Sequence, residues 1–317
     1  DGLTVNKLRV GNDRVEITAD GSIATGTADF DYALNLSDLG LLTPQAQGRL
    51  EATGKIAGTD GNLALNTIAR VPSGSLAGKR LTDASVTFDG VLANGALDGT
   101  LGGDAFIDGV RTQLSAGVSV AEGQRRLTDL DFTAGGARAT GAVTQNVNGL
   151  IDGEIKVEAA DISTAAALFL AQASGALNAD IQLSHADGIQ NANVTATARD
   201  LRINENRVGR ADIQAAARDL FNVPAIDGTV KAERVVAGGV DFSTINATAS
   251  TANTVTRFQA DTALANGARG AARGSLAPQD NGWRLALDEA SFGQGAIAAR
   301  LAQPAAVRVA GERIAID

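Results

Sequence analysis

The chain has no cysteine and no methionine, and it contains only one histidine, one tryptophan, one tyrosine and nine phenylalanines in 317 residues. Without cysteine there are no disulfides, thiolate metal ligands or cysteine nucleophiles. With a single histidine, a metal site would have to be built from carboxylates. Because methionine is missing even at position 1, we expect a processed chain or an internal fragment.

Basic residues and long apolar runs are also scarce. The chain has 27 Lys and Arg against 36 Asp and Glu, a formal net charge of −9. Because no basic stripe is available to neutralise phosphates, nucleic acid is not an expected partner. The sequence shows no run of about 18 apolar residues and no N-terminal signal segment. We therefore expect membrane contact to be made by parts of the protein outside this fragment.

The chain is rich in alanine, with 60 residues, and in segments where apolar and polar residues alternate. Alternation places one set of side chains on each face of a strand, so it predicts half-buried strands. The clearest sets contain Val15, Ile17 and Ala19; Leu63 and Leu65; Val86 and Phe88; Leu130, Phe132 and Ala134; Ile155, Val157 and Ala159; Ile181 and Leu183; Val194, Ala196 and Ala198; Phe258 and Ala260; and Trp283, Leu285 and Leu287.

Thirteen Asx-Gly pairs punctuate these segments. Nine Asp-Gly pairs begin at residues 1, 20, 60, 89, 98, 108, 152, 187 and 227, and four Asn-Gly pairs begin at 94, 148, 266 and 281. Asx-Gly supplies the positive φ angles of a two-residue type I′ turn, which joins antiparallel strands. The sequence therefore predicts an all-β, largely antiparallel fold with many hairpins.

Two segments break the period of two and begin an internal repeat. Leu36–Leu42 is expected to form one helical turn capped by Ser37 or Asp38, and Asp161–Ala173 a helix capped by Asp161 or Ser163 with Ala165, Leu168 and Phe169 on its apolar face. After them come Gly48-x-Leu50-x-Ala52 and Gly175-x-Leu177-x-Ala179, offset by 127 residues. Repeat units stack, so we expect residues 1–317 to form one elongated body with repeat units at roughly 36–160 and 161–290.

Catalytic chemistry has little support, and the sequence predicts neither an enzyme nor a cofactor. A Ser-His-Asp site would need His185, which lies in Ser184-His185-Ala186-Asp187-Gly188. We interpret this stretch as a hairpin turn and His185 as a solvated loop residue. A hydrolase with paired carboxylates stays open as an alternative, because residues distant in sequence can meet on such a scaffold. The arginines Arg269, Arg273 and Arg284 are typical of a solvated face.

The apolar face of the predicted sheet has two interpretations. If it closes against another sheet it is an ordinary core, which the composition favours. If it curls into an open trough, it becomes a groove for acyl chains, and a charge within it, such as Val157→Asp, should block their passage. The groove candidates are Leu63, Leu65, Val86, Phe88, Leu130, Phe132, Ile155, Val157, Ile181, Leu183, Val194, Phe258, Leu285 and Leu287.

Three stretches resemble the central β-repeat region of the TamB family, within the wider group of AsmA-like bridge proteins: residues 34–52, 159–179 and 283–311. The resemblance implies a β-taco, which is an elongated U-shaped sheet with an apolar inner groove. It implies a periplasmic bridge tethered to the inner membrane by an N-terminal anchor missing here. It also implies phospholipid transport toward the outer membrane, support of outer-membrane protein assembly, and a TamA-like barrel as partner. The family has no active-site residues to carry over.

Two other functions remain open. The chain could template the strands of outer-membrane β-barrels by β-augmentation at exposed sheet edges. It could also be an extracellular β-solenoid, an adhesin or a carbohydrate-active enzyme, although solenoids repeat every 20–30 residues or so and the period here is 127.

Overall fold

The structure is a computed structural model that describes residues 2–24, 26–59, 61–222, 224–279, 282–310 and 313–316. The chain divides into two compact units. Unit 1 comprises Asp1–Gly149 and Ala159–Gln172, and unit 2 comprises Leu150–Glu158 and Ala173–Asp317. The expectation of one continuous body stays a prediction.

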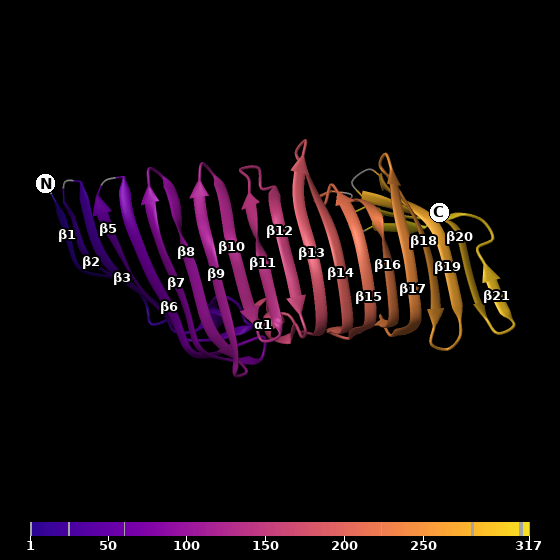
Figure 1. The fold of residues 1–317 in the computed structure, drawn as a ribbon, viewed down its shortest axis with the longest axis horizontal. Helices are drawn as coiled ribbons and strands as arrows, with labels where there is room; N and C mark the ends of the chain where they lie inside the picture. The colour runs from indigo at the N-terminus through magenta and orange to yellow at the C-terminus, as the bar shows by residue number, and fades with distance from the viewer. Residues whose placement is uncertain are drawn as a thin grey trace. The chain divides into compact units, whose positions relative to one another are not determined.

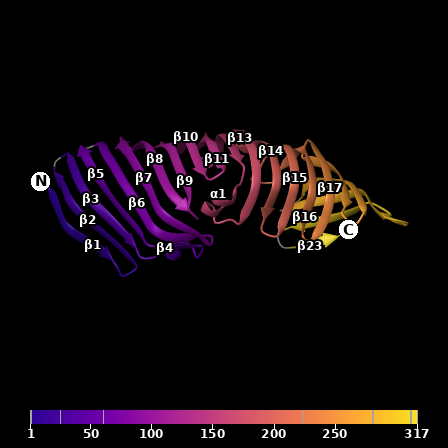
Figure 2. The ribbon, with the colours of Figure 1, turned by 60° about the horizontal axis from the view of Figure 1, so that its bottom comes forward.

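Unit 1 is a row of antiparallel strands, drawn from indigo to magenta in Figure 1. Figure 2 shows its longer strands curving along their length. Its elements are β1 (Leu3–Gly11), β2 (Val15–Ala24), β3 (Thr27–Leu36), the 3-10 turn η1 (Leu39–Leu41), β4 (Ala46–Gly48), β5 (Leu50–Thr59), β6 (Asn62–Leu76), β7 (Lys79–Ala93), β8 (Ala96–Ile107), β9 (Val110–Ala121), β10 (Gln124–Ala134), β11 (Ala137–Gln145) and the helix α1 (Ser163–Leu168).

Unit 2 is built in the same way, from strands that follow one another through hairpins. Its elements are β12 (Ile151–Ala159), β13 (Ala173–Ala186), β14 (Ile189–Ile203), β15 (Asn206–Arg218), β16 (Ala225–Ala237), β17 (Val240–Ala252), β18 (Val255–Leu264), β19 (Arg269–Gln279), β20 (Gly282–Gln294), β21 (Ile297–Arg300), β22 (Ala305–Ala310) and β23 (Arg313–Ile316).

Most strands pair with their chain neighbours, while β3 also pairs with β5, β4 with β6 and β20 with β22; the described pairings are antiparallel. Among the described residues β1 pairs with β2 alone, so the sheet does not close on itself. The prediction of an all-β, antiparallel, curled sheet is therefore confirmed. The antiparallel hairpins also contradict the β-solenoid interpretation, because a β-helix stacks parallel strands.

The Asx-Gly pairs do not all mark turns. Those at Asn94, Asp108, Asn148, Asp187 and Asn266 lie in turns or bends, while Asp1, Asp60 and Asn281 fall outside the described residues. The other five Asp-Gly pairs lie within strands, at Asp20, Asp89, Asp98, Asp152 and Asp227, so the hairpin prediction is wrong there. A close approach explains two of these glycines: a Cβ on Gly90 or Gly99 would come within 2.7 or 2.8 Å of the Phe88 ring.

Both predicted helical segments exist, but the second is shorter than expected. In η1 the cap is Asp38, whose carboxylate accepts a hydrogen bond from the Gly40 amide at 2.9 Å. Helix α1 ends at Leu168 rather than Ala173, and the chain enters β13 at Ala173. Thr164, Ala166 and Ala167 are its buried residues, whereas Phe169 is 78% exposed, so the predicted apolar face is wrong at Phe169.

Strand bounds follow the offset seen in the sequence. Strands β6 (Asn62–Leu76) and β14 (Ile189–Ile203) each contain 15 residues, and both ends differ by 127. Strands β5 and β13 end at Thr59 and Ala186, with the same offset. At the start of each repeat, Gly48 and Gly175 have φ angles of 124° and 107°, which L side chains rarely adopt. The glycines are thus required by the backbone that opens each repeat.

Bulges within the strands reset which side chains share a face. Asp83 in β7 and Asp129 in β10 have φ angles of 50° and 49°, and the register shifts there. Both follow Leu-Thr, at Leu81 and Leu127. Asp tolerates the left-handed region better than most residues. Each bulge therefore lets the alternation restart with apolar residues on the same face.

The chain buries few large side chains. Its accessible surface is 19000 Å², whereas a compact monomer of 32.1 kDa would expose about 12,000 Å². Ile107 is the largest side chain below 2% exposure among the described residues. No helix in the described part of the chain is long and apolar enough to cross a membrane.

Candidate functional site

One face of the unit 1 sheet is apolar across successive strands. In register, Val10 pairs with Ile17, which pairs with Leu34, and the row continues through Ala52, Ala69 and Val86. The next row holds Leu8, Ala19, Tyr32, Gly54, Thr67 and Phe88. Paired residues in a sheet point to the same side. We call this side the unit 1 apolar face.

The opposite face carries the polar partners. A row there contains Asp31, Lys55, Asn66, Asp89 and Thr100. Its charges are paired: Lys55 Nζ lies 2.8 Å from Asp29, and Arg138 Nη2 lies 2.7 Å from Asp131. The side-chain hydrogen bond from Arg138 lowers the pKa of Asp131. Most of the charged residues of unit 1 therefore lie on this face, although Ile68 and Val91 share it, and the longer rows of apolar side chains lie on the other face.

The unit 1 apolar face is covered at one end and open elsewhere. Ala167 of α1 packs with Val71, Leu81 and Ile107, and Leu39 of η1 joins this cluster. Figure 1 places α1 at the lower ends of the strands. Away from this cluster Val10 is 58% exposed, Ile17 48% and Val86 45%. Large apolar side chains in a row are rarely left this exposed without a binding role.

Unit 2 has an apolar face with a different profile. One row runs through Ile181, Val194, Ala215, Gly228, Ala249, Phe258, Gly274 and Leu287. Its middle residues Ala215, Gly228 and Ala249 are small, while Val194 and Phe258 flank them. The side chains of this row therefore project less from the sheet at Ala215, Gly228 and Ala249 than at Val194 and Phe258. Buried alanines Ala198, Ala211 and Ala232 form a cluster with Val235 on the same face.

The structure places all fourteen groove candidates in strands. Val86 is exposed and the other thirteen are half-buried. In unit 1, Leu63, Leu65, Val86, Phe88, Leu130 and Phe132 share the apolar face. In unit 2, Ile181, Val194, Phe258 and Leu287 lie in one row, with Leu183 and Leu285 two residues from it on β13 and β20. Ile155 and Val157 alternate with exposed Glu154, Lys156 and Glu158 on β12.

Several residues of the apolar faces were not among the candidates. Leu8, Val10, Ile17 and Leu34 belong to the most exposed part of the unit 1 face. The alternation of Leu8 with Val10 could have identified β1, but the bulge at Lys7, with φ of 53°, interrupts it. The hydrogen bond between the Tyr32 and Thr67 hydroxyls, at 2.5 Å across Gly54, had no sequence signal.

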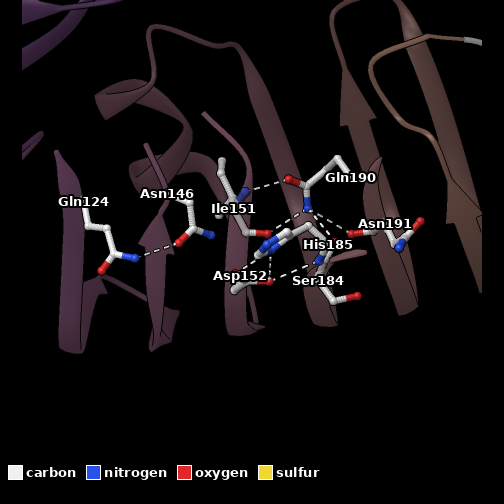
Figure 3. A network of polar contacts seen from close by, with 8 residues as sticks. All are labelled: Gln124, Asn146, Ile151, Asp152, Ser184, His185, Gln190 and Asn191. Carbon is white, nitrogen blue, oxygen red and sulfur yellow. Dashed lines mark hydrogen bonds and ion pairs between the residues drawn. The ribbon is translucent and has the colours of Figure 1, made fainter. Parts of the chain in front are cut away.

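A polar network in unit 2 surrounds the only histidine (Figure 3). His185 lies in β13 rather than in a loop, and its Nδ1 is 2.8 Å from Asp152 Oδ1, so the loop interpretation is wrong. The turn itself is at Asp187 and Gly188. Gln190, 3% exposed, accepts from the Ile151 amide at 2.7 Å and donates to the Ile151 carbonyl at 2.8 Å.

This network ties β12 to the β13–β14 hairpin. Gln190 also donates to the Ser184 carbonyl at 3.0 Å, and the Ser184 side chain points away from the His185 ring (Figure 3). A nucleophile must lie within hydrogen-bond reach of its base. These hydrogen bonds therefore hold β12 against the β13–β14 hairpin, and Ser184, His185 and Asp152 do not have the geometry of a Ser-His-Asp catalytic triad. In the described part of the chain, no group of three or more metal-ligating side chains is gathered.

Comparison of the chain with family models, with curated proteins and with solved structures gave no match.

Proposed function

We propose that the apolar faces of both units bind the acyl chains of phospholipids and that the chain is a segment of a phospholipid-carrying bridge. The observation that carries the proposal is the row of half-exposed apolar side chains along each unit, on the face opposite most of the charged residues. The sheet does not close on itself, because β1 pairs with β2 alone among the described residues.

The energetics of lipid transfer require such a surface. Exposing an acyl chain of about 16 carbons to water costs on the order of 12 kcal/mol, at about 0.8 kcal/mol per methylene. On a row of apolar side chains spaced by neighbouring strands, about 4.8 Å apart, each methylene leaves one contact as it gains the next. Movement along the face then meets only small barriers and needs no fixed polar site.

The setting we propose follows the resemblance to TamB-like proteins. The segment would act in the periplasm, between an inner-membrane anchor outside this chain and a TamA-like barrel in the outer membrane. Support of outer-membrane protein assembly belongs to the same proposal.

Strand templating has less structural support. Strand β1 is an edge within the described pairings, but it carries a lysine and a bulge at Lys7. Both features blunt an edge against pairing with another strand.

The test is a titration with a fluorescent C16 fatty acid. Val194→Asp places a charge on the apolar face of unit 2, and Val157→Asp places one among the half-buried residues of β12. In both, binding should weaken about tenfold or more, since an unpaired charge costs several kcal/mol against hydrocarbon. Thr195→Asp is the matched control, because Thr195 neighbours Val194 but is exposed on the polar face. It should bind as the unchanged chain does.

A second variant separates binding from folding. Ala215→Leu fills the Val194–Phe258 row where its side chains project least, without adding charge, and should also weaken binding while circular dichroism stays unchanged. Equal affinity in Val194→Asp, Ala215→Leu and the unchanged chain would contradict the proposal.

A further inference from the structure

The end of unit 2 contains a hollow of about 960 Å³ over strands β18 to β21. These strands lie at the orange-to-yellow end of Figure 1. Most of the charged and polar residues that line it belong to one face of these strands: Gln259, Asp261, Arg269, Arg273, Glu289 and Ser291. Gly270, Ala272, Ala290 and Phe292, which alternate with them, also line it. The lining includes no residue of the row from Ile181 to Leu287 described above for acyl chains.

Small residues lie between the charged residues of its lining. Across the strands, Asp261 pairs with Ala271, Ala271 with Ser291, and Ser291 with Arg300. In the neighbouring row, Arg269 pairs with Gly293, and Gly293 with Ala298. The absence of large side chains at Ala271, Ser291, Gly293 and Ala298 leaves room between the arginines for a ligand of a few heavy atoms.

The charges around the hollow are unevenly balanced. Arg273 is paired with Glu289 at 2.5 Å, but the side chains of Arg269 and Arg300 have no hydrogen bond or ion pair within the described residues. Asp261 accepts only a long hydrogen bond from Gln259, at 3.4 Å. Three arginines thus face two carboxylates, in a chain whose formal net charge is −9. A guanidinium without a partner beside a serine hydroxyl suits a phosphate oxygen.

We propose that this hollow is a phosphate-binding site, in which Arg269 and Arg300 bind the oxygens of a phosphate ester and Ser291 donates a further hydrogen bond. Arg273 stays with Glu289 and contributes to the positive field. The phosphate could belong to a free phosphate ester or to the headgroup of an anionic lipid at a surface, since both present the same oxygens. The site does not depend on acyl-chain binding.

The first arm of the test is calorimetric titration with glycerol 3-phosphate at low salt. The double variant Arg269→Gln, Arg300→Gln should weaken binding at least tenfold. Arg257→Gln is the matched control, because Arg257 is an exposed arginine on the same face of β18 that does not line the hollow. Asp261→Asn should tighten binding, because it removes a negative charge from the lining; a merely structural role for Asp261 would not produce that gain.

The second arm distinguishes the two sources of phosphate. Co-sedimentation is measured with vesicles containing phosphatidylglycerol and with vesicles of phosphatidylcholine alone. Saturable binding of glycerol 3-phosphate identifies a free ester, and binding only to phosphatidylglycerol vesicles with the same variant dependence identifies a headgroup.

No binding in either arm, or equal binding by the double variant, would overturn the site. The double variant should keep full affinity for the C16 fatty acid. Failure of the phosphate site and failure of acyl-chain binding are therefore observed in separate assays.

Discussion

At the residue scale, glycine and alanine decide how closely the strands approach. A Cβ on Gly228 would collide with the backbone carbonyl of Gln214 on the neighbouring strand, whereas one on Gly293 would meet nothing closer than 3.8 Å. Neither glycine has a φ angle in the left-handed region. Their difference is therefore a matter of space and not of backbone conformation.

Gly228→Ala should lower the free energy of unfolding by about 1–3 kcal/mol, because the strands must move apart to admit the methyl group. Gly293→Ala should leave it within about 0.5 kcal/mol. Urea unfolding followed by circular dichroism measures both. Equal effects of the two substitutions would show that the close approach at Gly228 does not matter.

Also at the residue scale, Asp108 links the β8–β9 turn to β7. Its carboxylate accepts from the Arg80 amide at 2.8 Å and from Lys79 Nζ at 3.1 Å. The Arg80 hydrogen bond, followed by that of Lys79, lowers the pKa of Asp108 from its ordinary 3.8. Because the folded-state pKa is the lower one, the stabilisation is fully present above the unfolded-state pKa and is lost as pH falls through the folded-state pKa.

The variant that tests this is Asp108→Asn, because Asn also tolerates the φ of 50° found at this position. The difference in unfolding free energy between the unchanged chain and this variant should be constant from pH 5 to 7 or so and should shrink below about pH 4. Urea titrations across this range measure it. A difference that stays constant down to about pH 2 would contradict the assignment.

At the scale of elements, α1 and η1 stabilise one end of unit 1. Ile107 is 1% exposed and contacts the cluster that includes Ala167 of α1. Ile107→Ala should cost about 2–5 kcal/mol through lost burial and a residual cavity. Val86→Ala, on the same face but 45% exposed, should cost under about 1 kcal/mol.

Chemical denaturation measures this pair, and hydrogen exchange locates the loss. Faster exchange of the α1 amides in Ile107→Ala is expected, because the helix has only six residues and depends on packing. Equal costs for Ile107→Ala and Val86→Ala would mean that the covered end is no more tightly packed than the open face.

The same elements show what sequence could and could not predict. The alternation is unbroken from Leu177 to Leu183 in β13 and from Val194 to Ala198 in β14, so these strands and their apolar face followed from it directly. The bulges at Asp83 and Asp129 could not be foreseen, because a pattern of alternation does not show where the register shifts. Asp-Gly was misleading at Asp89 and Asp98, since Gly90 of β7 and Gly99 of β8 are needed where the Phe88 ring lies against them, a contact set by the pairing of the two strands.

The length of helix α1 was overestimated for a related reason. Its Ala and Leu residues favour helix, but the chain must turn at Leu170, whose φ is 55°, to begin β13. The groove candidates were found because they are large and alternate. Arg300 and the hollow beside Ser291 were missed, because they depend on the register of β18 to β21.

At the scale of the molecule, each unit uses one sheet face for solvent and leaves the other largely uncovered. The surface of 19000 Å² is consistent with this division. Exposing an apolar face of this extent to water is unfavourable, and a long, flexible, apolar ligand would cover it. The most direct test uses Trp283, the only tryptophan of the chain, which alternates with Leu285 and Leu287 on β20.

That test is quenching of Trp283 fluorescence by a brominated C16 fatty acid, compared with the unbrominated acid. Bromine quenches only at close contact, so acyl chains bound to the unit 2 apolar face should lower the emission in a saturable way. Thr195→Asp should be quenched equally, and Val194→Asp markedly less. Emission that is the same with both fatty acids, at concentrations where either is soluble, would contradict the account.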